Sequence, residues 1–415
     1  MLSINDPVNK GLNMSKITPG AGLPVPDADA KAHSEQLCTS IRNEMELHGG
    51  KITFHRFMEL ALYEPGLGYY SAGAYKFGER GDFITAPEIS PLFSRCMARQ
   101  CSQILGILGN ADILEAGAGS GLMACDILAE LERLDSLPEH YCILEISADL
   151  RERQRTLIQQ RIPHLLERFH WLDHMPDEGF SGVVLANEVL DAMPVHRVHI
   201  GPHTAQEYFI RAANGHFEWC VDDPSNEHVQ RRMIAIRQLL GADIREHGYS
   251  TEINLAAESW ARSIADAMAC GLVLIIDYGF PRREYYHPDR REGTLMCHYR
   301  HYAHTDPLMF IGLQDITSHI DFTAVAEAAF DSGLKVAGYT NQAHFLLSCG
   351  LMETADSKPF ASDVSGSAAK LRQAQEIKKL TLPHEMGELF KVLALTRGIT
   401  APLLGFSLKD DRGRL

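Results

Sequence analysis

A strand that turns sharply into a helix through three glycines is the feature that most constrains this chain. An apolar strand reaches Glu115, and a helical pattern begins at Leu122 after Gly117, Gly119 and Gly121. Glycines are needed where a strand turns tightly into a helix and where a ligand must touch the backbone. The nicotinamide fingerprint G-x-G-x-x-G requires a glycine where this chain has Leu122, so that fingerprint does not fit.

The spacing E-x-G-x-G-x-G resembles motif I of the class I S-adenosylmethionine (SAM) methyltransferases. In those enzymes the acid before the glycines lies near the charged methionine end of the cofactor. The resemblance implies that the cofactor is bound by Glu115, Gly117, Ala118, Gly119 and Gly121. An ordinary glycine-rich turn between a strand and a helix is the alternative, because short motifs also occur by chance.

A second acid stands at the end of the next predicted strand. Residues 141–144 form an apolar run that ends at Glu145, after a helical segment near 121–134. This order predicts one βαβ unit. A carboxylate at the tip of the second strand can accept hydrogen bonds from both ribose hydroxyls, so we expect Glu145 and its neighbour Ile146 to bind the cofactor. NAD enzymes use the same acid, and a Glu145 that simply faces solvent is the alternative.

Composition excludes several classes of protein. The net charge of −15 argues against a general nucleic-acid binder, whose footprint is basic. No apolar run reaches the roughly 18 residues of a membrane span, so no membrane insertion is expected. The nine cysteines are scattered without a C-x-x-C pair, which is typical of buried thiols in a reducing compartment. The sequence therefore predicts a bacterial cytoplasmic protein.

The length of 415 residues predicts a core domain with insertions or a second lobe. Strands that alternate with helices predict an α/β fold with a doubly wound, Rossmann-like sheet. The expected divisions are a mobile tail over 1–35, a helical lid region over 36–108, a core over 109–190, 225–279 and 320–398, a β-meander insertion over 191–224 after the fourth strand, a histidine-rich loop insertion over 280–319 after the fifth, and a C-terminal tail over 399–415. Residues 34–62 are expected to be helical and residues 353–366 to form a loop.

Further motifs occur in one order along the chain. They include Gly68-Tyr69-Tyr70, Asp82-Phe83-Ile84-Thr85-Ala86-Pro87-Glu88, Asn187-Glu188-Val189-Leu190-Asp191, Asp277-Tyr278-Gly279 and Gln314-Asp315-Ile316-Thr317. With the glycine turn, they resemble the MidA family, the bacterial relatives of the mitochondrial complex I assembly-factor methyltransferase, over about residues 40–350.

The resemblance implies a SAM-dependent methyltransferase, with S-adenosylhomocysteine (SAH) as the product of the cofactor. The mitochondrial member is a protein arginine methyltransferase that acts on a complex I subunit. The resemblance therefore implies a protein substrate, such as a respiratory complex subunit, and it is compatible with a homodimer. What the bacterial members methylate does not follow from it.

In open α/β sheets, ligands bind beyond the carboxyl ends of the strands. Leu172 and Asp173 end the third core strand, where an adenine is usually met, and Asn187 ends the fourth. Trp171 is expected in the core more than in a stack on the adenine. Thr85, in a loop expected to cover the cofactor, offers a further hydrogen bond, although a loop that only packs between helices is the alternative.

Glu188 and Asp191 follow the fourth strand three positions apart, so on a helical turn they would share one face. A guanidinium stays protonated, so its nitrogen needs carboxylates that hold the fork and localise the charge. We therefore predict that this pair is catalytic and cradles an arginine. In the alternative, Asp191 caps a turn and Glu188 pairs with an arginine. Asp277 ends a buried strand, where a role toward the acceptor and a role in a turn are equally expected.

The sequence predicts no metal site, because His298, His301 and His304 lack an accompanying cysteine or acid at regular spacing. The predicted function is a SAM-dependent protein arginine methyltransferase linked to respiratory complex assembly. A dinucleotide oxidoreductase is disfavoured by Leu122. A non-enzymatic assembly or binding factor that keeps the fold, and a small-molecule methyltransferase, stay as alternatives.

Overall fold

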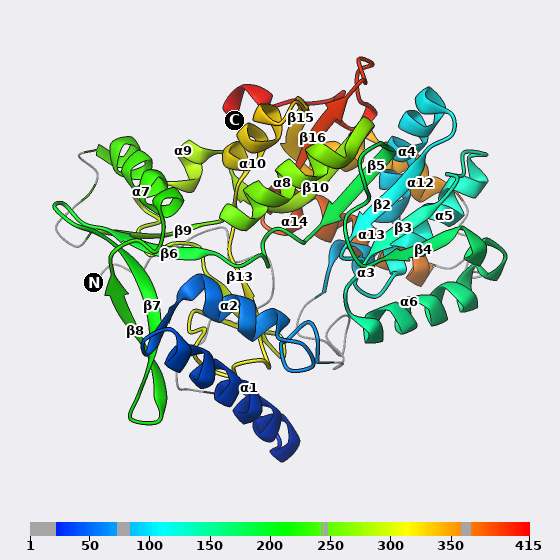
Figure 1. The fold of residues 1–415 in the computed structure, drawn as a ribbon. Coiled ribbons are helices and arrows are strands. Elements are labelled where there is room, and N and C mark those ends of the chain that lie inside the picture. Colours follow the sequence, from blue (N-terminus) through cyan, green and yellow to red (C-terminus); the bar gives the residue numbers. More distant parts are fainter. Residues whose placement is uncertain (1–21, 73–83, 242–243, 245–247, 358–366) are drawn as a thin grey trace.

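The computed structural model describes residues 22–72, 84–241, 244, 248–357 and 367–415. Its centre is a mixed sheet with the strand order β15-β16-β10-β5-β2-β3-β4, and the short β14 pairs with β10 (Figure 1). Neighbours from β10 through β5, β2 and β3 to β4 are parallel, whereas β16 is antiparallel to β10 and to β15. The strands are β2 (Asp112–Ala116), β3 (Tyr141–Leu144), β4 (Phe169–Leu172), β5 (Phe180–Asn187), β10 (Met268–Phe280), β14 (Ile320–Asp321), β15 (Lys335–Asn341) and β16 (Phe390–Arg397).

Helices cover both faces of this sheet. The nearly all-apolar strand β10 shows why, since residues 271–277 are buried throughout, as expected of a central parallel strand. Leu272 and Leu274 pack with α4 (Pro91–Leu108) and α5 (Leu122–Arg133) on one face. Val273 and Ile275 pack with α8 (Leu255–Ala267) and α10 (Phe322–Asp331) on the other. The sheet is therefore doubly wound, as the sequence predicts.

The order of the strands creates a place for a ligand. β2 has β3 on one side and β5 on the other. The chain leaves β2 through α5 to β3, then through α6 (Ala148–Arg161) and the 3₁₀ helix η2 (Pro163–Arg168) to β4, and it returns to β5 on the opposite side of β2. At such a switch point the connections diverge, which leaves a crevice beyond the carboxyl ends of the strands.

A second, antiparallel sheet lies beside the central one, on the left of Figure 1. Its order is β1-β7-β6-β9, with β8 paired to β7. Its helix α7 packs on it through an apolar face that includes Met233 and Ile236. The predicted boundary of this insertion at residue 224 is wrong, because α7 and β9 belong to the same sheet and the insertion continues to Ile253. The elements are β1 (Lys51–Thr53), β6 (His196–Ile200), β7 (Ala205–Ala213), β8 (His216–Asp222), α7 (Glu227–Leu240) and β9 (Tyr249–Ile253).

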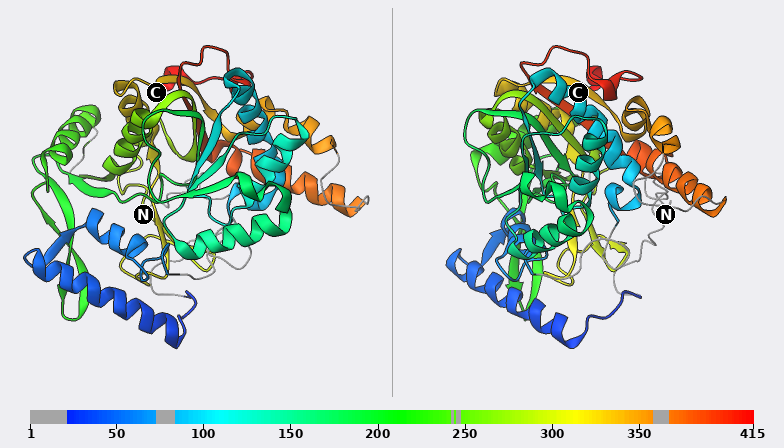
Figure 2. Two further views of the ribbon diagram at one scale, coloured as in Figure 1. Left: turned by 45° about the vertical axis from the view of Figure 1, so that its right-hand side comes forward. Right: turned by 90° about the vertical axis from the view of Figure 1, so that its right-hand side faces the viewer.

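The N-terminal region packs against this second sheet. Its helices are α1 (Ala28–Leu47) and α2 (Phe54–Tyr63), followed by the short α3 (Ala86–Ile89). Helix α1 begins earlier than the predicted end of the tail at residue 35, because the Asp27 side chain accepts the N–H of Ala30 at 2.9 Å and caps the helix. The expected helical stretch over 34–62 also contains the strand β1. Residues 1–21 of the predicted tail lie outside the described part of the chain. Both views in Figure 2 show α1, in dark blue, at the end of the molecule away from the C-terminus.

The histidine-rich insertion contains a small sheet as well as loops. Its elements are α9 (Arg282–Tyr285), β11 (Met296–Tyr299), β12 (Tyr302–His304) and β13 (Asp315–Thr317), with β11 in the middle. Apolar residues of this insertion, such as Cys297 and Ile316, share one buried cluster with α1 and α2. Helices α1 and α2 and this insertion therefore form one packed unit.

The C-terminal region differs from expectation in two places. Helix α12 (Leu351–Asp356) occupies the start of the expected loop over 353–366, of which residues 358–366 lie outside the described residues. The predicted C-terminal tail is packed, since Phe406 is buried against Phe345 and the N–H of Asp411 donates to the carbonyl of Tyr339 at 2.6 Å. The remaining elements are α11 (Gln342–Ser348), α13 (Ser367–Thr381), α14 (Met386–Leu389), η4 (Leu404–Phe406) and η5 (Arg412–Arg414). Among the described helices, none combines the length and the apolar character that a membrane crossing requires.

Candidate active site

A cavity of about 480 Å³ lies at the switch point of the central sheet. Its walls come from the ends of β2, β3 and β5, from the glycine turn, from the start of α6, and from the segments around α2 and α3. The structure brings most of the predicted cofactor residues together along it: Thr85, Glu115, Gly117, Ala118, Gly119, Glu145, Ile146 and Asn187. Asp82 and Phe83, at the start of the predicted lid motif, lie outside the described residues.

The glycine turn has the backbone that its sequence suggests. Gly117, Gly119 and Gly121 have φ values of 65°, 53° and 81°, a region that residues with a side chain rarely adopt. A Cβ atom on Gly121 would lie 3.1 Å from Cγ of Gln154, and one on Gly117 would lie 3.1 Å from Cγ2 of Val189. Gly121 begins α5 and packs against α6, so its place is behind the lining of the cavity.

Glu115 is buried at the end of β2 and reaches the cavity. The Tyr141 hydroxyl on β3 donates to Oε2 of Glu115 at 2.7 Å. Burial raises the pKa of Glu115 to about 7, and the hydrogen bond from Tyr141 opposes this shift. The carboxyl group is therefore close to half-ionised at neutral pH.

Glu145 and the glycine turn are joined by one side chain that the sequence analysis missed. The side-chain amide of Gln154, on α6, donates to the carbonyl of Gly119 at 3.0 Å and to Oε2 of Glu145 at 3.4 Å. Its Oε1 accepts the indole N–H of Trp171 at 2.8 Å. Oε1 of Glu145 also accepts the N–H of Ser147 at 2.9 Å, and burial raises the pKa of Glu145. Gln154 is fully buried and has no motif of its own; its only sequence signal is a polar residue at an apolar position of α6.

Leu172 and Asp173 are not among the described residues that line the cavity. The guanidinium of Arg151 donates to the carbonyl of Leu172 at 3.1 Å and pairs with the carboxylate of Asp173, while its Nε donates to the carbonyl of Glu145 at 2.5 Å. Trp171 packs against the core, as the sequence favours. Arg151 therefore covers the ends of β3 and β4, and a role for Leu172 and Asp173 at an adenine stays a prediction.

Glu188 enters the cavity from a strained turn after β5. Its φ is 54°, which is uncommon for a residue with a side chain. Its N–H donates to the carbonyl of Ile276 at 2.9 Å, and its Oε1 accepts from the N–H of Ala86 at 3.4 Å and from the Asn187 amide at 3.2 Å. Burial first, and then the charge of Asp277, raise the pKa of Glu188 to about 8.

Asp277 stabilises this turn through hydrogen bonds to backbone N–H groups. It is fully buried, and its Oδ2 accepts the N–H groups of Leu190 and Asp191 at 3.0 and 3.1 Å, while Oδ1 accepts the N–H of Tyr278 at 2.8 Å. Burial raises the pKa of Asp277 to about 7. Asp277 does not line the cavity, so the structure matches the turn role of the two that the sequence left open.

The structure does not bring Asp191 to the cavity beside Glu188. Asp191 is buried and is absent from the described lining. Burial, followed by the charges of Asp277 and Asp315, raises the pKa of Asp191 well above its usual value. The expectation of a shared face assumed a helical turn, whereas the φ of 54° at Glu188 shows that the turn after β5 is not helical at this residue.

The charged side chains among the described lining of the cavity are all acidic. Four carboxyl side chains line it, from Glu88, Glu115, Glu145 and Glu188, and no lysine, arginine or histidine is among the described lining residues. Coulomb attraction is strong where water is excluded, so such a cavity favours ligands that carry positive charge.

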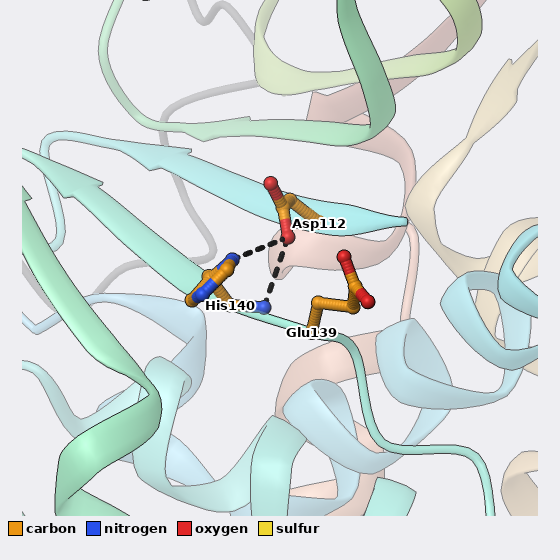
Figure 3. Close-up of side chains that lie close together, drawn as sticks. All are labelled: Asp112, Glu139 and His140. Atoms are coloured by element: carbon orange, nitrogen blue, oxygen red, sulfur yellow. Dashed lines mark hydrogen bonds and ion pairs between the residues drawn. The ribbon is translucent and has the colours of Figure 1, made fainter. Parts of the chain in front are cut away.

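The described residues bring three potential metal ligands together elsewhere. One atom each from Asp112, Glu139 and His140 lie within 4.8 Å of one another (Figure 3). Oδ1 of Asp112 accepts the backbone N–H of His140 at 2.9 Å and lies 3.1 Å from its Nδ1. This group stands at the start of β2, whereas the glycine turn follows the end of β2, and its contacts fix the turn into β3. The histidines at 298, 301 and 304 do not line the cavity either.

Comparison with known proteins decides the family. Residues 96–340 match the model of the family described as "Putative S-adenosyl-L-methionine-dependent methyltransferase". The chain belongs to this family. A crystal structure of a COG1565 superfamily member from Burkholderia thailandensis bound to S-adenosyl-homocysteine is 42% identical, with a TM-score of 0.88, and covers 95% of this chain and 100% of its own. A native structure from the same superfamily and organism is 41% identical, with a TM-score of 0.86 and the same coverage.

More distant relatives carry a more specific name. A Drosophila melanogaster protein named "Protein arginine methyltransferase NDUFAF7 homolog, mitochondrial" is 29% identical and covers 92% of this chain and 91% of its own length. The Mus musculus protein with the NDUFAF7 name is 27% identical over 88% of this chain and 86% of its own. The predicted family resemblance and fold class are confirmed. The protein is a SAM-dependent methyltransferase, and SAM is its cofactor.

The residues of the cavity fit this cofactor. SAM carries positive charge on its sulfonium and amino groups. The described lining contains four glutamates and no lysine, arginine or histidine. Gly117 and Gly119 have no side chains and adopt positive φ values, so the backbone of the turn is open to a ligand. Glu145 presents a carboxylate at the tip of β3, where a ribose needs an acceptor.

Proposed function

We propose that the protein transfers the methyl group of SAM to an arginine side chain of a protein. The observation that carries this proposal is Glu188, a carboxyl group on a strained turn. It lies in a cavity whose described lining contains no lysine, arginine or histidine. The names of the relatives at 29% and 27% identity support the same acceptor. A respiratory complex subunit as the substrate follows from the family resemblance and is part of this proposal, and the cytoplasmic location stays a prediction from the sequence.

The assignment of the cofactor contacts belongs to the same proposal. Glu145 accepts the ribose hydroxyls, and Gln154 keeps its Oε2 in place from behind. The glycine turn at Gly117 and Gly119 presents backbone to the methionine end, where Glu115 supplies negative charge. Ile146, which is 71% exposed although it lines the cavity, is free to be covered by the bound nucleoside.

Bound SAM supplies an electrophilic methyl group with a good leaving group, so the protein's work is positioning and proton transfer. In our proposal, Glu188 accepts N–H groups of the guanidinium and draws its positive charge toward the nitrogens it faces. The nitrogen that points at the methyl group then has the larger electron density. With a pKa of about 8, ionised Glu188 can also take the proton that the methylated guanidinium releases from a nitrogen that Glu188 faces.

Intact-mass analysis of candidate protein substrates, with and without SAM, tests the proposal. We expect a mass gain of one or more methyl groups, which peptide sequencing places on arginine. In Glu188→Gln the rate should fall on the order of a hundredfold, while SAH affinity stays within about threefold. Glu152→Gln, an exposed site on α6, is the matched control and should keep the wild-type rate.

The same experiment separates the alternatives. Methyl transfer to small amines or hydroxyls but to no protein would indicate a small-molecule methyltransferase. SAH binding with no transfer to any acceptor would indicate an assembly factor that keeps the fold.

A further inference from the structure

Two stacked tyrosines line the cavity. Tyr63 ends α2, and Tyr70 follows it in a tight loop, where its N–H donates to the carbonyl of Leu62 at 2.8 Å. Their ring centroids are 5.5 Å apart and the rings are within 19° of parallel. Tyr69 is buried behind them and packs edge-on against Tyr70 at 5.0 Å. The two rings therefore form a supported pair, which we call the tyrosine wall.

Hydrogen bonds fix both rings at their phenolic ends. The Tyr63 hydroxyl donates to the carbonyl of Ala192 at 2.9 Å, and the Tyr70 hydroxyl donates to Oδ1 of Asp315 at 2.9 Å. Asp315 is buried in the histidine-rich insertion, and Ala192 lines the cavity four positions after Glu188. Each hydroxyl donates its proton to the protein, so the wall offers its ring carbons to a ligand and has no free hydroxyl proton to donate.

The wall is anchored on the turn that carries Glu188. Ala192 and Val189 continue the chain from Glu188 along the lining, and the Tyr63 hydroxyl contacts the backbone of Ala192. The cofactor residues of the glycine turn and of the tip of β3 come from the other core strands. The wall and Glu188 therefore line one cavity, and the turn from Glu188 to Ala192 joins them.

We propose that the tyrosine wall, Tyr63 and Tyr70, selects a planar guanidinium over an ammonium group at the acceptor end of the cavity. This inference rests on the proposed arginine methylation and names the residues that set its specificity. A guanidinium is planar, delocalised and weakly hydrated, and it stacks on aromatic faces while its edge donates to a carboxylate. An ammonium group is compact and strongly hydrated, so it loses more hydration and gains no stacking at the same wall.

The first test measures binding without catalysis. SAH-loaded protein is titrated with ethylguanidinium and with ethylammonium, which share the alkyl chain and the charge, and binding is followed by NMR. We expect the wild type to bind ethylguanidinium at least fivefold more tightly. Tyr63→Leu and Tyr70→Leu should bring the ratio to within twofold, whereas Tyr63→Phe, which keeps the ring, should retain it. Unchanged SAH affinity shows that each variant is folded.

The second test uses the arginine substrate and a copy of it with lysine at the target position. Tyr63→Leu should raise KM for the arginine substrate about tenfold and change kcat less, since the wall holds the acceptor and leaves the proton transfer to Glu188. Tyr63→Phe should keep KM within about twofold.

The outcomes distinguish this inference from the proposed function. An equal affinity of the wild type for both probes, or a guanidinium preference that persists in the folded leucine variants, overturns the inference even if arginine methylation is found. A ring-dependent guanidinium preference without methyl transfer to any arginine supports the wall and overturns the proposed function.

Discussion

The Tyr141 hydroxyl donates a hydrogen bond of 2.7 Å to the carboxyl group of Glu115, and it joins β3 to the acid at the end of β2. The hydrogen bond stabilises the ionised carboxyl, whereas burial favours the neutral one and raises the pKa of Glu115 to about 7. The ionised fraction of Glu115 therefore changes with pH around neutrality. We expect the affinity for the cofactor to change with it.

We predict that SAH binds more tightly as the pH rises from 6 to 8. The positively charged amino group of the ligand favours the ionised form of Glu115, so binding is weakened wherever that carboxyl must first lose a proton. The expected gain approaches about tenfold per pH unit below the pKa of Glu115 and levels off above it. Calorimetry in the Glu188→Gln protein isolates this effect from the titration of Glu188.

Tyr141→Phe supplies the control for the same prediction. It removes a hydrogen bond that favours the ionised carboxyl, so the midpoint should move to higher pH. Tyr302→Phe, in the small sheet of the histidine-rich insertion, should leave the profile unchanged. SAH affinity that is flat from pH 6 to pH 8 in the wild type would contradict the role of Glu115 charge.

The glycine turn gives a second prediction. Gly119→Ala places a Cβ at a φ of 53°, where we propose that the backbone meets the cofactor. We expect SAH affinity to fall at least tenfold. Gly109→Ala is the matched control, because Gly109 has a φ of 77°, has nothing within 4 Å of an added Cβ, and lies outside the described lining of the cavity. Both variants should lose about 1 kcal/mol of unfolding free energy through backbone strain. An equal loss of affinity in both would indicate strain alone.

Gln154 gives a third prediction. Gln154→Leu leaves the carbonyl of Gly119, one oxygen of Glu145 and the indole N–H of Trp171 without their buried partner. An unsatisfied buried polar group costs about 1–3 kcal/mol, so we expect a clear loss of unfolding free energy. SAH affinity should fall as well, because both cofactor loops lose their common support. Gln159→Leu, an exposed position on the same helix, is the control. Wild-type SAH affinity in a folded Gln154→Leu protein would show that Gln154 does not position these loops.

Local sequence patterns predicted the parts of this protein whose geometry is local. The turn from β2 into α5 needs three glycines within five positions, and Glu145 follows β3 directly, so neighbouring residues suffice to place both. β10 is predictable for the same reason, because its apolar run reports burial on both faces.

Pairings between distant segments were not predictable in this way. The assignment of β9 to the second sheet depends on its register with β6, about fifty residues earlier, so the boundary at 224 failed. Gln154 acquires its role only when α6 packs beside the glycine turn. The turn after β5 is not helical because Glu188 has a φ of 54°, and the residue types around it do not specify this angle.

The last prediction concerns Asp277, which holds the Glu188 turn without lining the cavity. Asp277→Asn keeps one accepting oxygen and puts an NH2 group in place of the other, so it cannot accept both from Tyr278 and from the N–H groups of Leu190 and Asp191. Methyl transfer should fall more than tenfold through displacement of Glu188, while SAH affinity changes less. Asp289→Asn, an exposed carboxylate, should leave transfer unchanged.

The pH dependence of stability tests the same residue independently of activity. The pKa of Asp277 is about 7 in the folded protein and near 3.8 without the fold, so between these values the folded state binds more protons than the unfolded state. The unfolding free energy contributed by this group is therefore present in full below about pH 4 and is lost as the pH rises toward 7. Asp277→Asn lacks this contribution, so urea unfolding should show the largest difference from wild type near pH 4 and a smaller one at pH 8. A difference that grows with pH would mean that Asp277 is ionised throughout, and that its charge, rather than its proton, stabilises the turn.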